Sequence, residues 1–153
     1  MEKTKTAGTG FLKVTGILMI VFGAIAIVVT GIGIAAVGVI EKMANSLASM
    51  EGITVDEALA EQGVSLGLLY VGMILSLVGS IVQLVAGIIG IKNCRRPEKA
   101  QTCLVWGVLV ALFAVAGSIL TPIAGGDFNI LSLFTGLVIP VLFIIGALKN
   151  KQA

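Results

Sequence analysis

The chain has 153 residues, of which 58% are hydrophobic and 12% are charged, and its formal net charge is +2. Soluble domains usually contain about 25% charged residues, so this composition argues against a soluble globular protein. The chain has no histidine, and it therefore lacks the commonest general base and metal ligand of proteins.

The charged residues gather in short clusters that are separated by long uncharged stretches. The uncharged stretches cover 14–40, 63–91, 100–126 and 128–148. A helix that spans a bilayer needs roughly 20 apolar residues, and each stretch is long enough. We therefore predict one all-α membrane domain, a four-transmembrane-helix bundle. Its elements are the spans 11–40, 66–91, 102–120 and 128–148, an outer loop 41–64, a cytoplasmic turn 92–101 and an outer turn 121–127.

The distribution of charge predicts the orientation of this bundle. Nine of the ten basic residues lie before 14, in the turn 92–101 or after 148, and only Lys42 lies on the other side. Basic loops usually stay in the cytoplasm, so we expect a multi-pass plasma-membrane protein with both termini cytoplasmic (N-in, C-in). Basic clusters beside a span are attracted to anionic headgroups. The expected partner is therefore the lipid bilayer, and no nucleic acid is expected.

Small residues recur along the first span. Gly16, Gly23, Gly31 and Gly38 follow one another at intervals of seven, eight and seven residues, so they share one side of a helix. Small residues allow neighbouring helices in a membrane to approach closely. Glycine is also generally frequent in membrane helices, and the spacing alone does not separate these two interpretations.

The outer loop contains signals for helical structure. Met43 and Leu47 lie on one face if the first helix continues past residue 41, and Gly52 then breaks it. Thr54 and Glu57 have the spacing of a capping box, and Gly63 is placed to end the short amphipathic outer helix that follows.

The acidic residues of this loop are candidate ligands for a cation. Asp56, Glu57 and Glu61 do not follow a metal-ligand spacing, so a solvated polar face is expected and no metal is assigned.

The span 66–91 has the sharpest pattern in the chain. Its small and weakly polar residues fall on one helical face, whereas its bulky apolar residues fall on the other. Gln83 is the most polar residue of any span, and an unsatisfied amide in hydrocarbon costs several kcal/mol. Gln83 is therefore expected to point into the bundle. It either forms a hydrogen bond between helices, the favoured interpretation, or marks a ligand or permeation site.

The span 102–120 repeats this pattern, with small residues spaced by three or four positions. We predict that the small faces of 66–91 and 102–120 meet in one intramembrane seam of packing and polar residues. The seam consists of Gly72, Ser76, Gly79, Ser80, Gln83, Gly87, Gly107, Ala111 and Ser118.

Two cysteines lie near the cytoplasmic turn. Cys94 and Cys103 are expected to be reduced, because disulfides are rare in the cytoplasm. Arg95 and Arg96 would favour a thiolate at Cys94, but unreactive cysteines are the favoured interpretation. Whether either thiol is modified stays open.

The end of the chain adds three expectations. Pro122 is expected to end the third span, Asp127 to cap the fourth, and Pro140 to kink it. Similar sequences at 88–93 and 144–150 suggest duplicated hairpins over 11–93 and 102–150, as in some membrane proteins. The alternative is that glycine followed by lysine is a common way for a helix to leave a membrane.

The predicted order of elements resembles that of claudins, MARVEL proteins and tetraspanins, and the resemblance covers topology only. The loop 41–64 has neither cysteine nor tryptophan, so the loop motifs of claudins and tetraspanins cannot be placed on it, and no functional residue is carried over.

No catalytic residue, cofactor-binding residue or cofactor is assigned. The expected function is that of a non-enzymatic membrane protein that acts through a membrane-protein partner or as a homo-oligomer. The alternatives are a channel or transporter subunit, with a polar path along Gln83, Ser76, Ser80 and Ser118, and a binding protein for a lipid or an apolar small molecule.

Overall fold

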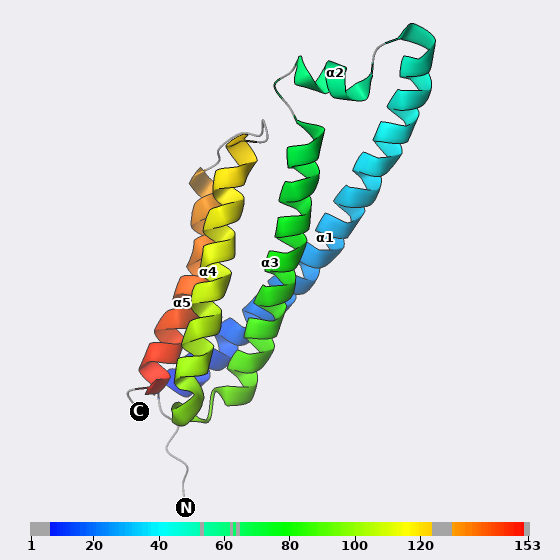
Figure 1. The fold of residues 1–153 in the computed structure, drawn as a ribbon. Coiled ribbons are helices and arrows are strands. Elements are labelled where there is room, and N and C mark those ends of the chain that lie inside the picture. The colour runs from blue at the N-terminus through cyan, green and yellow to red at the C-terminus, as the bar shows by residue number, and fades with distance from the viewer. Residues whose placement is uncertain (1–6, 53, 62, 64, 124–129, 152–153) are drawn as a thin grey trace, which may run out of the picture.

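The computed structural model of the chain describes residues 7–52, 54–61, 63, 65–123 and 130–151, and all regular structure in them is helical. Figure 1 shows the arrangement. The elements are α1 (Ala7–Glu51), α2 (Val55–Ala60), α3 (Leu66–Asn93), the short 3₁₀ helix η1 (Pro97–Lys99), α4 (Ala100–Ile123) and α5 (Ile130–Lys151).

Three helical segments within the described part of the chain are long and apolar enough to cross a membrane. They are Gly8–Leu47, Leu66–Asn93 and Pro97–Leu120. These segments indicate an integral membrane protein. They include the stretches expected at 11–40, 66–91 and 102–120.

The first helix is longer than its expected span. α1 runs for 45 residues without a break and includes the turns around Met43 and Leu47. At 1.5 Å per residue it is about 68 Å long, more than twice the ~30 Å hydrocarbon core of a bilayer. Gly52, with a φ of 76°, follows its last residue. The chain turns there because glycine adopts positive φ at no steric cost.

The capping box of α2 is confirmed. The backbone N–H of Thr54 donates to Glu57 Oε2 at 3.0 Å, and the N–H of Glu57 donates to Thr54 Oγ1 at 3.4 Å. Two otherwise unpaired donors at the start of the helix are thereby satisfied. α2 is followed by Gly63, whose φ of 74° agrees with the expected stop.

This capping box predicts a dependence of α2 on pH. The backbone hydrogen bond from Thr54, followed by the bond from its hydroxyl, lowers the pKa of Glu57 below its ordinary value. These hydrogen bonds stabilise α2 at pH values above the pKa of the Glu57 carboxyl in the unfolded chain. The stabilisation is lost as the pH falls through the lower pKa of the folded state. Titration of the Glu57 carboxyl by NMR should show the low pKa in the wild type and a higher one in Thr54→Ala; equal values would contradict the assignment.

The four long helices form a ring in which each packs against two neighbours: α1 with α3, α3 with α4, α4 with α5, and α5 with α1. The beginning of α1, the end of α3, η1 and the end of α5 lie together at the lower end of Figure 1. We call this the basic end because it carries Lys92, Arg95, Arg96, Lys99, Lys149 and Lys151. α2 lies at the opposite end, which we call the acidic end.

The structure corrects one expected boundary. α4 continues through Pro122 to Ile123, so the proline does not end the helix before it. Pro122 is the second-last residue of α4, where its missing N–H removes only one terminal backbone bond. The expected cap Asp127 lies outside the described residues. Pro140 lies inside α5 and is buried.

Candidate functional site

The closest approach between α1 and α3 is built on glycines. A Cβ atom added to Gly87 would lie 2.7 Å from the Gly16 carbonyl oxygen, and one added to Gly16 would lie 3.1 Å from that of Gly87. About two turns later along α1 and two turns earlier along α3, a Cβ on Gly23 would lie 3.2 Å from the carbonyl oxygen of Ser80. The two backbones touch here because no side chain separates them.

An aromatic ring from α5 fills the centre of the ring of helices. Phe143 is fully buried, and its ring lies against Gly90 of α3 and Gly107 of α4. Both glycines leave room for the ring, since a Cβ on Gly107 would lie 3.0 Å from Phe143 Cδ1. Leu12 and Met19 of α1 are also fully buried in this core.

The small face of α3 does not form one seam with that of α4. Gly87 and Ser80 lie against α1, as described above, whereas Gly107 of α4 lies against Phe143 and Ile144 of α5. The expected pairing of small faces is therefore wrong at these positions. A small face gives a direction in which a helix can approach but does not specify which helix does so.

Where α3 does meet α4, small residues face large ones. A Cβ on Gly79 would lie 3.4 Å from Phe113 Cβ, and one on Gly72 would lie 3.8 Å from Leu120 Cδ2. Ala111 of α4 is partly buried. At both positions a large side chain of α4 therefore packs against a glycine of α3.

The polar residues of the expected seam are mostly bonded within the bundle. The Gln83 side-chain amide donates to the Met19 carbonyl of α1 at 3.4 Å, which agrees with the favoured interpretation as an interhelical hydrogen bond. The hydroxyls of Ser80 and Ser118 each donate at 2.8 Å to a carbonyl four residues earlier in their own helices. Ser76 is exposed.

The Gln83 bond predicts a small effect of substitution. Gln83→Leu removes one interhelical hydrogen bond, and such bonds in membranes contribute only about 0.6 kcal/mol. The variant should unfold at nearly the same SDS concentration as the wild type in a circular-dichroism titration. A loss several times larger would show that Gln83 holds more than this bond.

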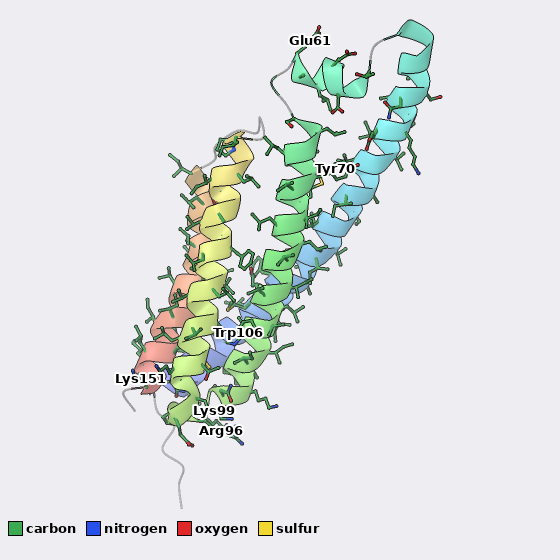
Figure 2. All side chains as sticks on the ribbon, viewed as in Figure 1. Glu61, Tyr70, Arg96, Lys99, Trp106 and Lys151 are labelled. Carbon is green, nitrogen blue, oxygen red and sulfur yellow. The ribbon has the colours of Figure 1, made fainter. Side chains whose placement is uncertain are left out.

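The glycine stripe of α1 has a role in packing over half its length only. Gly16 and Gly23 contact α3, but a Cβ on Gly31 would meet nothing within 4 Å, and one on Gly38 would only approach the Tyr70 hydroxyl at 3.9 Å. Tyr70 donates to Glu41 Oε2 at 2.8 Å, and this bond links α1 to α3 near the acidic end. Figure 2 shows Tyr70 and Trp106 toward opposite ends of the bundle, as expected for interfacial aromatics.

The basic end holds a buried amide that the sequence analysis missed. Asn150 is fully buried, and neither its Oδ1 nor its Nδ2 has a hydrogen-bond partner among the described residues. Asn150 lies beside the start of α1, where a Cβ added to Gly8 would lie 2.6 Å from the backbone nitrogen of Asn150. The repeated Lys-Asn pairs were the available signal, since Asn93 is also buried, at 8% exposure. The two cysteines, Cys94 and Cys103, are free and buried.

The unpartnered amide predicts a stabilising substitution. A buried polar group without a partner costs about 1–3 kcal/mol, so Asn150→Leu should raise the free energy of unfolding by about 1 kcal/mol. Asn45→Leu, at an exposed site on α1, is the control and should change it by less than about 0.5 kcal/mol. Lower stability of Asn150→Leu in thermal unfolding would show that the amide is hydrogen-bonded in the folded protein.

Burial is confined to one part of the bundle. Every buried residue among those whose burial is described lies toward the basic end: up to Gly23 on α1, from Ser80 on α3, up to Val110 on α4 and from Pro140 on α5. We call this part the packed half and the remainder, toward the acidic end, the open half. The transition occurs at a similar level on all four helices, so it is a property of the bundle and not of one helix.

Comparisons with protein-family models, with curated proteins and with solved structures find no match to this chain. Within the described part of the chain, no group of three or more His, Cys, Asp or Glu side chains is placed to hold a metal ion. The feature of the described helices that bears most directly on function is the division into a packed and an open half.

Proposed function

We propose that this chain is a non-catalytic plasma-membrane protein that crosses the bilayer four times, with α5 as the fourth span and both termini cytoplasmic. It acts by associating, through its open half, with another apolar molecule of the membrane. The observation that carries the proposal is the confinement of burial to the packed half, because the described residues of the apolar helices are then only partly covered toward the other end.

The charges support the proposed orientation. Seven cations of the described residues lie at the basic end, the six named above and Lys13, with Glu98 as the acid among them. Glu41, Asp56, Glu57 and Glu61 lie toward the acidic end with Lys42. Figure 2 shows Arg96, Lys99 and Lys151 at the end opposite to Glu61. Basic loops remain cytoplasmic, so the packed half would lie in the inner leaflet and the open half in the outer leaflet.

The bonded state of the polar groups favours association over a polar path. A channel lining needs donors and acceptors that are free to replace the hydration shell of a solute. The polar side chains here instead donate hydrogen bonds to backbone carbonyls: the hydroxyls of Ser80 and Ser118 and the amide of Gln83. An apolar associate makes no demand on these groups.

The test is the accessibility of single cysteines to a membrane-impermeant thiol reagent in intact cells. In a background with Cys94→Ser and Cys103→Ser, Asp56→Cys should react from outside. Lys99→Cys and Lys151→Cys should react only after the membrane is opened. Labelling of Lys99→Cys in intact cells would reject the orientation, and release of the chain by alkaline carbonate would reject the membrane assignment itself.

A further inference from the structure

The inner face of α3 becomes uncovered as it enters the open half. Gly90, Gln83 and Ser76 follow one another at intervals of seven residues, so they lie within one stripe of the helix. Gly90 is covered by the Phe143 ring, Gln83 is partly buried, and Ser76 is exposed. Over about 21 Å, the same face changes from the centre of the core to open space.

α1 shows the same change on its own inner side. Thr15 and Gly33 are 18 residues apart, which is five full helical turns, so they face the same way. Thr15 is only 3% exposed, whereas a Cβ added to Gly33 would meet nothing within 4 Å. Figure 1 shows the reason, since α1 starts beside the end of α5 and rises away from it. We call the space beside Ser76 and Gly33 the inner wedge.

We propose that the inner wedge binds an acyl chain of a zwitterionic phospholipid of the outer leaflet. This inference rests on the proposed orientation and names the associate of the open half. The length agrees with such an occupant: Leu66–Gly79, the open half of α3, is about 20 Å long, and one leaflet contributes about 15 Å of hydrocarbon. An extended acyl chain therefore fits the open half and ends where the packed half begins.

The chemistry of the wedge suits an occupant without hydrogen-bonding groups. The hydroxyl of Ser80, the nearest buried polar side chain to Ser76, donates to the Ser76 carbonyl, and the Gln83 amide donates to Met19. Val29 of α1, which is 14 residues after Thr15 and so lies on the same side of the helix, adds apolar surface that is 61% exposed. A polar group placed here would lose its water without gaining partners, whereas a hydrocarbon chain loses nothing.

The charge at the mouth of the wedge selects the headgroup. The acidic end carries Glu41, Asp56, Glu57 and Glu61 against Lys42 alone among its described residues. A like charge nearby is unfavourable, so an anionic headgroup is disfavoured. The quaternary ammonium of a phosphocholine headgroup is attracted instead. The Tyr70–Glu41 bond keeps α1 and α3 connected at this level and limits how far the wedge opens.

The test measures binding of two lipids to the purified full chain in detergent by native mass spectrometry. Phosphatidylcholine should bind the wild type about tenfold more tightly than phosphatidylglycerol, a difference of about 1.4 kcal/mol. The filled variant Gly33→Phe/Ser76→Phe should bind phosphatidylcholine about tenfold more weakly. The matched control Ile32→Phe/Val78→Phe places the same rings at positions of the same helices that are 65% and 42% exposed and lie outside the stripes of Gly33 and Ser76. It should bind like the wild type.

The outcomes separate this inference from the proposed function. Equal binding of both lipids by the wild type overturns the inference without any variant, so a filled variant that fails to fold does not protect it. Unchanged binding by a folded filled variant also overturns it. A disulfide-linked dimer of Gly33→Cys with no bound lipid shows that a second copy fills the wedge and overturns it as well. In each case the proposed membrane topology still stands if the chain resists carbonate extraction and the single cysteines show the expected accessibility.

Discussion

Gly87→Leu should disrupt the crossing of α1 and α3. The Cβ of any other residue at this position would lie 2.7 Å from the Gly16 carbonyl oxygen and 3.1 Å from the Ile20 nitrogen. Both are backbone atoms that cannot rotate away, so the helices must separate. Overpacking of a well-packed core costs about 1–3 kcal/mol, and a leucine against backbone should reach about 3 kcal/mol or more. Thermal unfolding in detergent, followed by circular dichroism, measures the loss.

The matched control is Gly31→Leu. Gly31 lies on α1, the helix that Gly87 contacts, but a Cβ added to it meets nothing within 4 Å. Replacing a helical glycine also improves helix propensity by up to about 1 kcal/mol, so this variant should be as stable as the wild type or more so. Equal destabilisation by both substitutions would show that the α1–α3 crossing does not depend on the contact at Gly87.

Phe143→Ala should leave a cavity at the centre of the bundle. Phe143 is fully buried and touches both Gly90 and Gly107, neither of which has a side chain to collapse into the space. Loss of a buried phenylalanine costs about 3–5 kcal/mol. The lower value is expected, because the hydrophobic transfer term is largely missing between helices in lipid. SDS titration of the purified variant measures the change.

Phe22→Ala is the control for this substitution. Phe22 is 47% exposed on α1, outside the packed half's buried core, and its loss should cost less than about 1 kcal/mol. If Phe22→Ala proves as damaging as Phe143→Ala, the centre of packing lies elsewhere and the division into a packed and an open half is wrong.

Local features were predicted well because they depend on neighbouring residues. The capping box at Thr54 and Glu57 and the turn at Gly52 follow from interactions within four residues. The long apolar helices follow from composition in the same way. Pro122 is the local signal that misled, because a proline near the last turn of a helix removes too few backbone bonds to stop it earlier.

The partners of helix faces could not be predicted in the same way. Ser80 and Gly79 are adjacent in sequence and share the small face of α3, yet one lies against α1 and the other against Phe113 of α4. A stripe about 100° wide is broad enough to meet two or three neighbours in a bundle. The periodicity therefore locates an inward face, and only the packing shows that α3 uses it for α1, α4 and α5 together.

Sequence alone determined the helices of this protein, their order and the separation of basic from acidic residues. These properties depend on composition and on spacing along one helix. The tertiary structure decided that Gly87 meets Gly16, that Phe143 fills the centre, that Asn150 is buried without a hydrogen-bond partner among the described residues, and that the last buried residues of α1 and α3 toward the acidic end are Gly23 and Ser80. Each of these depends on the crossing of helices far apart in sequence, which no single helical pattern encodes.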